Sequence, residues 1–455
     1  MFRRSFLKSL AVAPAAGLIR PPRLDAALPK AKITKVNIYE PPNVNRLVNQ
    51  SNMVITVETD IGITGIGEGG TRDMLEQCAG NLIGQDPFHI ERIWQESYVS
   101  WFYPPGREKI HAQGAMDLAL WDIKGKALKL PVHEILGGTV RNFVECYATG
   151  NVRPGGEAGG GRGRGGARGE GGARGGGARG EAGQESGARR GGGGGGQGGD
   201  PFENIRRTAE ATMAAGYRAY RMDASIGGAI PDNIFDTHQR VRLVAQACKA
   251  AREGVGSKGD FTIDFHQKFD FIDALRCCKL IEDYEPYLVE DPVRDEHFNE
   301  DIPMLRRMTT CPLAAGEEWG QRYDFNKLVE NHDLDYIRAT LPNVGGITEM
   351  LKVLALCDTH SIGIVPHFTG PISTAALVNV LSTFPGPVMF EYNYGDRSIN
   401  YLPECLDFKN GKVYTNDRPG LGVTLDVKQV KPISSVTTVG RRQFYLRPDG
   451  SVTHW

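Results

Sequence analysis

The sequence predicts an α/β protein whose main part is a barrel of parallel strands. From Phe143 onward, eight short apolar runs alternate with segments of helical periodicity, which is the pattern of repeated strand–helix units. Three acidic residues, Asp264, Glu290 and Glu317, each stand where such a run stops, at intervals of 26 and 27 residues. One strand–helix unit fits each interval, so the three carboxylates are expected at one rim of the barrel.

The first residues are expected to be a separate targeting segment. Arg3 and Arg4 precede an apolar stretch from Leu10 to Ile19 that is too short to cross a bilayer, and small residues follow near Ala27. Residues 1–27 therefore look like a bacterial twin-arginine export signal, with a basic amphipathic N-terminus as the alternative. An export signal would place the folded protein in the periplasm.

Residues 31–140 are expected to form a smaller α+β region. The alternating runs Met53–Glu58 and Gly62–Gly67 predict a short antiparallel sheet, and Glu68 ends the second run. The stretch from 110 to 128 predicts a helix, because small and apolar residues recur every four positions, at Ala115, Ala119, Ile123 and Ala127.

The barrel itself is expected over residues 141–391, with a C-terminal segment over residues 392–455. Its eight strands are predicted at Phe143–Ala148, Tyr217–Met222, Phe261–Phe265, Tyr287–Glu290, Pro312–Ala315, Tyr336–Ala339, Gly363–Val365 and Val388–Glu391.

A low-complexity segment, residues 155–199, interrupts this pattern. It holds 25 of the 58 glycines and no apolar residue larger than alanine, so it cannot build a core. Its Arg-Gly repetition permits an RNA-binding interpretation, but the segment lacks aromatic residues for base stacking. A disordered surface loop is the expected structure.

Composition favours a small-molecule partner. The 53 basic and 54 acidic residues give a formal charge of −1, which offers no electrostatic basis for binding nucleic acid or an anionic membrane surface. The eight cysteines show neither a zinc-type spacing nor a disulfide framework, so most are expected to be buried thiols.

The acidic residues predict a metal site, and two histidines fit the same rim. Three carboxylates that converge on one rim form an oxygen cage for a hard divalent cation, and Mg²⁺ is the natural candidate. His266 follows Asp264 by two residues, so an extended strand would project both side chains to one face. His367 stands at the end of the seventh predicted strand.

Several motifs carry a family resemblance over most of the chain from Ile33 to Trp455, the glycine-rich segment excepted. The chain resembles the enolase superfamily and, within it, the mandelate racemase-like acid-sugar dehydratases. The motifs are Ala119-Leu120-Trp121-Asp122-Ile123-Lys124-Gly125-Lys126, Leu136-Gly137-Gly138, Asp264-Phe265-His266, Val289-Glu290-Asp291-Pro292, Ala314-Ala315-Gly316-Glu317, Gly345-Gly346-Ile347-Thr348 and Pro366-His367.

The resemblance implies a modified TIM barrel, (β/α)7β, with an α+β capping domain to which the C-terminal segment returns. It implies that Asp264, Glu290 and Glu317 hold Mg²⁺, that His367 is the general base, and that His266 protonates the departing hydroxyl. Loops of the cap, around Asn43–Gln50 and Gly69–Asp73, would set the substrate specificity.

Other positions depart from the family pattern or extend it. The second strand carries Arg221 and Asp223 where racemases commonly have a lysine base, and a guanidinium is a poor base. Arg221 is predicted to bind a carboxylate or hydroxyl of the substrate, and Asp223 to orient a sugar hydroxyl, with a structural role as the alternative for Asp223. Glu391 at the eighth strand is predicted to bind substrate as well. Thr340 stands where many relatives have an aspartate that orients the catalytic histidine, and a threonine cannot stabilise an imidazolium as a carboxylate does.

The sequence therefore predicts a Mg²⁺-dependent dehydratase that converts a sugar acid, an aldonate, to a 2-keto-3-deoxy acid. An epimerase or cycloisomerase on the same scaffold, and a catalytically silent periplasmic protein that binds sugar acids, are the alternatives. We also expect a homo-oligomer that binds neither nucleic acid nor membrane.

Overall fold

The computed structural model describes residues 28–42, 53–100, 106–149, 200–225, 235–392, 399–440 and 443–453. The predicted export signal, the glycine-rich segment and the predicted specificity loop Asn43–Gln50 lie outside the described residues. No helix in the described part of the chain is long and apolar enough to cross a membrane.

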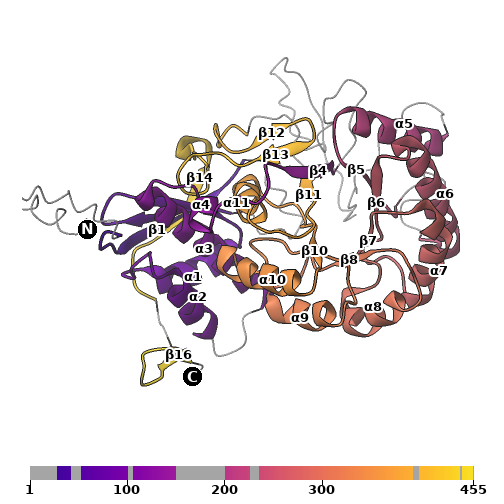
Figure 1. The fold of residues 1–455 in the computed structure, drawn as a ribbon. Coiled ribbons are helices and arrows are strands. Elements are labelled where there is room, and N and C mark those ends of the chain that lie inside the picture. Colours follow the sequence, from indigo (N-terminus) through magenta and orange to yellow (C-terminus); the bar gives the residue numbers. More distant parts are fainter. Residues whose placement is uncertain are drawn as a thin grey trace, which may run out of the picture.

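Eight parallel strands close into a barrel (Figure 1). Consecutive strands pair from β4 to β10, β11 pairs with β4, and a bridge between Ile364 and Val388 joins β10 to the residues before β11. All eight predicted strands are present within a few residues of their expected bounds. They are β4 (Val144–Ala148), β5 (Ala219–Asp223), β6 (Asp260–Asp264), β7 (Leu288–Glu290), β8 (Leu313–Ala315), β9 (Tyr336–Ile337), β10 (Gly363–Ile364) and β11 (Phe390–Tyr392).

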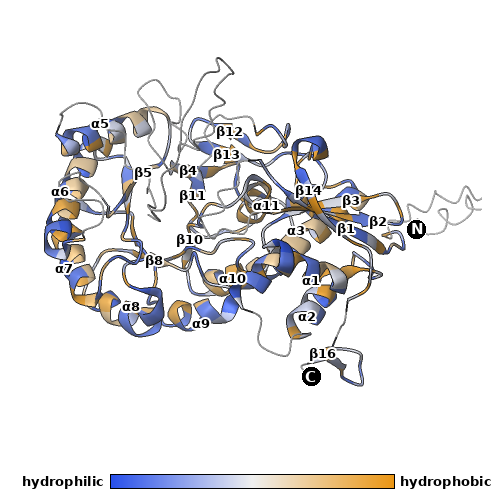
Figure 2. Ribbon diagram, turned by 180° about the vertical axis from the view of Figure 1, so that it is seen from behind, coloured by the Kyte–Doolittle hydropathy of each residue, from blue (hydrophilic) through white to orange (hydrophobic). Residues whose placement is uncertain are grey.

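Seven helices alternate with these strands, which confirms the predicted (β/α)7β order. They are α5 (Pro201–Ala214), α6 (Thr237–Val255), α7 (Phe271–Ile281), α8 (Phe298–Arg306), α9 (Arg322–Glu330), α10 (Ile347–Thr359) and α11 (Pro371–Leu381), with short 3₁₀ turns at η1 (Glu282–Tyr284) and η2 (Asp295–His297). Helices α5 to α10 carry hydrophobic and hydrophilic residues (Figure 2), as expected for a layer between a core and solvent, whereas every residue of α11 is buried.

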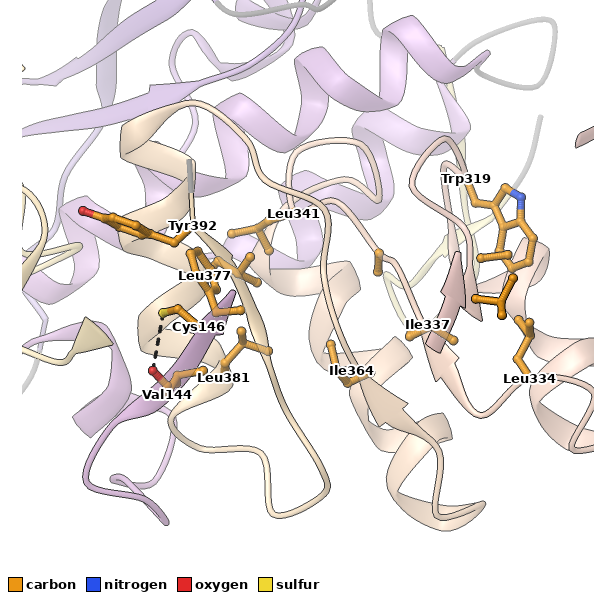
Figure 3. Close-up of a cluster of buried hydrophobic side chains, with 14 of the residues drawn as sticks. Val144, Cys146, Trp319, Leu334, Ile337, Leu341, Ile364, Leu377, Leu381 and Tyr392 are labelled. Carbon is orange, nitrogen blue, oxygen red and sulfur yellow. Dashed lines mark hydrogen bonds between the residues drawn. The ribbon is translucent and has the colours of Figure 1, made fainter. Parts of the chain in front are cut away.

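The core lies between strands and helices, and a second, smaller cluster fills the barrel. In Figure 3, Val144 and Cys146 of β4 lie beside Leu377 and Leu381 of α11. Because side chains alternate along a strand, residues next to those that face the helices point into the barrel. The inner cluster that they form includes Tyr147, Ala219, Leu288, Ala314, Val365 and Met389. The eight cysteines are free thiols, and all except Cys405 are buried, as predicted.

A capping domain precedes the barrel in sequence. It contains β1 (Ile33–Glu40), β2 (Val54–Thr59), β3 (Thr64–Glu68), α1 (Arg72–Leu82), α2 (Ile90–Val99), α3 (Arg107–Leu128) and α4 (Val132–Ile135). The sheet is antiparallel, in the order β14-β1-β2-β3, and its own apolar cluster packs it against the helices. Figure 1 shows this domain beside the barrel, next to α10 and α11.

The C-terminal segment contacts both parts. Strands β12 (Asp407–Lys409) and β13 (Lys412–Tyr414) form a hairpin that extends the barrel sheet from β4. After η3 (Val427–Gln429), β14 (Lys431–Val436) pairs with β1 of the cap, which is the predicted return to the capping domain. A last hairpin joins β15 (Tyr445–Leu446) and β16 (Val452–Thr453).

Two buried carboxylates of the cap fix the start of two barrel helices. Glu68, at the end of β3, accepts hydrogen bonds from the backbone N–H groups of Ile372 (2.9 Å) and Ser373 (3.0 Å) in the first turn of α11. Asp117 of α3 accepts one from the N–H of Thr348 (2.9 Å) in the first turn of α10. Carboxylates satisfy the free N–H groups of a helix N-terminus, so these contacts lock the cap onto the barrel beside its rim.

We expect Glu68→Gln to change how stability depends on pH. Burial raises the pKa of Glu68 from 4.5 to about 7, so the folded state retains a proton that the unfolded state releases between these values. This proton therefore stabilises the folded state at low pH. About 3 kcal/mol of the free energy of unfolding is lost as the pH rises to about 7. A glutamine cannot ionise, so the variant should gain about that much relative to wild type between pH 4.5 and 7.5, measured by urea unfolding.

The matched control is Glu58→Gln, because Glu58 is partly exposed and pairs with Lys35 at 3.4 Å. Its difference from wild type should stay within about 0.5 kcal/mol at both pH values. Near Glu68 the ionisable groups are Tyr401 and Cys405, and burial raises the pKa of each above its usual value, so both stay neutral in this range. A pH-independent difference for Glu68→Gln would show that the carboxylate is ionised throughout.

Candidate active site

The three predicted metal ligands lie at one end of the barrel. Asp264 is the last residue of β6, Glu290 is the last residue of β7, and Glu317 follows β8 by two residues. Their side chains are 2%, 0% and 14% exposed, respectively. Parallel neighbours β6 and β7 place Asp264 directly beside Glu290 in register, which explains why acids at strand ends converge.

Electrostatics show that these acids crowd one another. Burial, followed by the charge of Glu290, raises the pKa of Glu317 to about 8, and the same two causes raise the pKa of Asp264 well above its usual value. Asp291 belongs to the same group, because burial and then the charge of Glu317 raise its pKa well above its usual value. Such mutual repulsion is relieved when a cation binds between the carboxylates.

The orphaned oxygens of this cluster also fit a cation. Oε2 of Glu290 and both carboxylate oxygens of Asp291 are buried without a partner among the described residues, whereas Oε1 of Glu290 forms an ion pair with Arg338. Carboxylate oxygens are the ligands that hard divalent cations prefer. The donor chemistry therefore suits a divalent cation at this rim. The ligand atoms of Asp264, Glu290 and Glu317 do not all lie within 4.8 Å of one another, so the triad predicted from sequence stays a prediction.

A second grouping shares one of these ligands. In the described part of the chain, the ligand atoms that all lie within 4.8 Å of one another come from Asp223, Asp264 and His266. The amine of Lys268 lies 3.0 Å from Asp223 and already neutralises that carboxylate. The predicted triad and this second group are thus two distinct arrangements that an experiment can separate.

Two arginines enter the barrel and contact the acids. Arg221 of β5 places Nη2 at 2.5 Å from Oδ2 of Asp264. Arg338, which follows β9, places Nη2 at 2.5 Å from Oε1 of Glu290 and at 3.8 Å from Oε2 of Glu317. Arg221 is predicted from the sequence to bind substrate. In the structure its guanidinium is paired with Asp264, a predicted metal ligand.

His266 reaches the rim by a route that the sequence did not predict. Strand β6 ends at Asp264, and both His266 and Gln267 have positive φ angles, 49° and 57°, so strand alternation does not place the imidazole. The turn brings Nδ1 to 3.5 Å from Oδ2 of Asp223 and from Oδ2 of Asp264. A hydrogen bond with Asp223, followed by the charge of Asp264, raises the pKa of the half-exposed His266.

His367 lies on the loop between β10 and α11. Its ring lies against that of Phe368, tilted by 33° with 4.3 Å between the ring centroids, and its Nε2 is 3.7 Å from Oε2 of Glu317. Burial lowers the pKa of this histidine, whose side chain is 17% exposed. The neutral imidazole is the form that can accept a proton.

Thr340 does not stand in for the missing carboxylate. Its hydroxyl donates to the backbone oxygen of Glu317 at 2.9 Å, and the side-chain amide of Asn343 donates to the same oxygen at 3.1 Å. Thr340 therefore fixes the loop that carries a predicted metal ligand. It offers the imidazole of His367 no charge.

Glu391 is buried within β11 and is held as an anion. Its Oε2 accepts a hydrogen bond from Nη2 of Arg338 at 2.6 Å, and the hydroxyl of Thr149 donates to its Oε1. Against the opposing effect of burial, the positive charge of Arg338 lowers the pKa of Glu391 below its usual range. Its predicted role in substrate binding, like that of Asp223 and Arg221, stays a prediction.

Sequence reasoning missed Arg338, Asp291, Tyr147 and Lys268. An arginine in the apolar run Tyr336–Ala339 was the one available signal for Arg338, because a charge at an inward barrel position requires a partner. Asp291 follows Glu290 directly in the motif Val289-Glu290-Asp291-Pro292, and the sequence alone assigns it no separate role. Tyr147 and Lys268 carry no sequence signal without the barrel geometry.

The fold is a barrel with a capping domain, and the rim of the barrel carries a cluster of acidic residues and histidines. Residues 32–137 match the mandelate racemase/muconate lactonizing enzyme N-terminal domain, and residues 204–430 match the enolase C-terminal domain-like family. The chain therefore belongs to the mandelate racemase/muconate lactonizing enzyme family of the enolase superfamily.

Curated relatives and solved structures agree with this membership. D-galactonate dehydratase of Pectobacterium atrosepticum is 30% identical over 442 residues, covering 93% of this chain and all of that protein, and D-galactonate dehydratase of Xanthomonas oryzae is 30% identical over 421 residues, covering 89% and 96%. An enolase superfamily member from Salmonella typhimurium has the same fold, with a TM-score of 0.72, 24% identity and coverage of 89% and 100%. An enolase from Agrobacterium radiobacter that holds sodium and L-malate has a TM-score of 0.70, 23% identity and coverage of 92% and 99%.

Proposed function

We propose that the protein is a hydro-lyase that dehydrates a sugar acid of the aldonate class to a 2-keto-3-deoxy acid. The observation that carries the proposal is the placement of the two histidines. His266 follows β6 and His367 follows β10, four strands apart in a closed barrel of eight, so they face the barrel mouth from opposite sides. The D-galactonate dehydratases similar to this chain support the same reaction class.

The two imidazoles differ in the way an acid and a base must differ. His367 is buried and has a lowered pKa, so at neutral pH it can accept the proton α to the substrate carboxylate. His266 has a raised pKa because Asp223 and Asp264 favour its charged form, so it carries a proton to donate. Two groups with pKa values pushed in opposite directions suit an elimination in which one removes a proton and the other supplies one.

The proposed elimination breaks two bonds of the substrate and releases one molecule of water. The C–H bond at Cα breaks as His367 takes the proton, and the C–O bond at Cβ breaks as His266 protonates the hydroxyl, which leaves as water. The enol that remains tautomerises to the 2-keto acid. A divalent cation, which we propose to be Mg²⁺ bound by Asp264, Glu290 and Glu317, would supply positive charge at the substrate carboxylate.

The test is turnover of an aldonate panel, beginning with D-galactonate, with Mg²⁺ present. A dehydratase releases a keto acid that semicarbazide traps. An epimerase exchanges the α-proton in deuterium oxide without releasing keto acid, and a binding protein does neither while sugar acids still raise its melting temperature. Either of the last two outcomes would overturn the proposal.

A further inference from the structure

A single buried guanidinium holds the backbone on one side of His367. The Arg338 side chain is completely buried inside the barrel. Its Nη1 donates to the backbone oxygens of Val365 (2.8 Å) and Pro366 (3.2 Å), the two residues before the histidine, and to the hydroxyl of Tyr147 (2.6 Å). The same side chain thus connects β9, β4 and the end of β10.

Its ion-pair partner holds the other side. Glu391 Oε2, 2.6 Å from Nη2 of Arg338, also accepts a hydrogen bond from the backbone N–H of Phe368 at 3.2 Å. The N–H of His367 itself donates to the backbone oxygen of Arg338 at 3.4 Å. The residues before and after the histidine are therefore tied to one ion pair.

The chemistry of the two side chains explains why this arrangement needs an arginine. A guanidinium is a rigid planar fork with five N–H donors, so it can serve two carbonyls, a hydroxyl and the carboxylates of Glu391 and Glu290 at once. A lysine amine has three donors on a flexible stem and cannot reach all five groups. Burying such a charge is tolerated where hydrogen bonds and counter-charge are provided. Here both Nη atoms have partners and two carboxylates supply the counter-charge, while Nε is buried without a partner among the described residues.

We propose that the Arg338–Glu391 pair is the positioning device for His367, taking the place of the side-chain carboxylate that Thr340 does not supply. It acts through the backbone of residues 365–368 rather than through the ring. The inference rests on the proposed function for the role of His367, and it names Arg338 as a positioning residue that does not touch substrate.

Arg338→Lys tests this, because it keeps the buried positive charge and removes the fork. With a turned-over aldonate and saturating Mg²⁺, we expect kcat to fall about 10- to 100-fold while KM stays within about threefold. Hydrogen exchange followed by mass spectrometry should show faster deuterium uptake at the amides of His367 and Phe368, in peptides spanning residues 363–373.

Arg306→Lys is the matched control. Arg306 pairs with Asp335 at 2.9 Å, at the opposite end of β9, and its side chain forms no hydrogen bond or ion pair with residues 365–368 in the described part of the chain. The same substitution there should leave both kcat and the exchange of residues 363–373 unchanged. A parallel change in both variants would mean that lost arginine packing in general, and no specific tether, is responsible.

Unchanged exchange at His367 and Phe368 together with unchanged kcat in Arg338→Lys would overturn the proposal. If that variant does not fold, Glu391→Gln judges the proposal by the exchange readout, with faster uptake at Phe368 expected. If wild-type protein turns over no aldonate, the proposed function fails, but the exchange experiment still decides whether the ion pair tethers the loop.

Discussion

Replacing His367 with asparagine is expected to abolish keto-acid formation and also the exchange of the substrate α-proton with solvent deuterium. We propose this imidazole as the base, because burial lowers its pKa, and asparagine keeps a polar side chain that cannot accept the proton. General base catalysis contributes about 100- to 10,000-fold, so both rates should fall by that factor. Exchange is measured by proton NMR of substrate in deuterium oxide, and keto acid by semicarbazide trapping.

His266→Asn is the informative companion, because it separates the two proton transfers. Proton abstraction precedes loss of the hydroxyl, so this variant should stop keto-acid release while part of the exchange persists. Unfolding curves and Mg²⁺ titration of both variants establish that neither effect comes from lost structure. Full exchange in His367→Asn, or equal loss of exchange in both variants, would contradict the assignment of base and acid.

The barrel could be predicted from sequence because its signals are local. Short β-branched and apolar runs such as Phe261–Phe265, separated by helical segments of regular length, allow few architectures other than repeated strand–helix units. The acids at the ends of β6, β7 and β8 follow from the same regularity, since parallel strands end at one rim. Strand bounds shifted by one or two residues, as at β11, because pairing partners rather than propensity decide where a strand stops.

The candidate site was predicted less completely because its details depend on contacts between distant residues. His266 was expected to extend β6, but its left-handed backbone ends the strand and brings the ring to Asp223 by a turn. Arg338 meets Glu391 and Tyr147 only because the barrel closes, and residues 191 positions apart in sequence have no local signal for each other. The missing carboxylate at Thr340 could be seen in the sequence, whereas the Arg338–Glu391 ion pair, which contacts residues 365–368, could not.

Glu290→Gln is expected to weaken Mg²⁺ binding by more than about 100-fold, measured by isothermal titration with MgCl₂ alone. The carboxylate is fully buried, its Oε2 has no hydrogen-bond partner among the described residues, and its charge adds to burial in raising the pKa of Glu317 and Asp264. Loss of a residue that supports a metal ligand costs about 10- to 100-fold in affinity, and loss of a ligand should cost at least as much. Glu317→Gln should behave in the same way.

Three further variants decide between the two arrangements of acids. Glu318→Gln is the matched control, because Glu318 adjoins Glu317 but is half exposed and pairs with Arg107 at 3.3 Å, so Mg²⁺ affinity should not change. Asp223→Asn addresses the group formed by Asp223, Asp264 and His266, and should change the affinity by less than about threefold if the cation sits between β6, β7 and β8. The opposite pattern, with Asp223→Asn abolishing binding and Glu290→Gln leaving it intact, would move the cation to the second group. Because Asp264 belongs to both groups, Asp264→Asn should abolish binding in either case, and its failure to do so would remove the cation from this rim altogether.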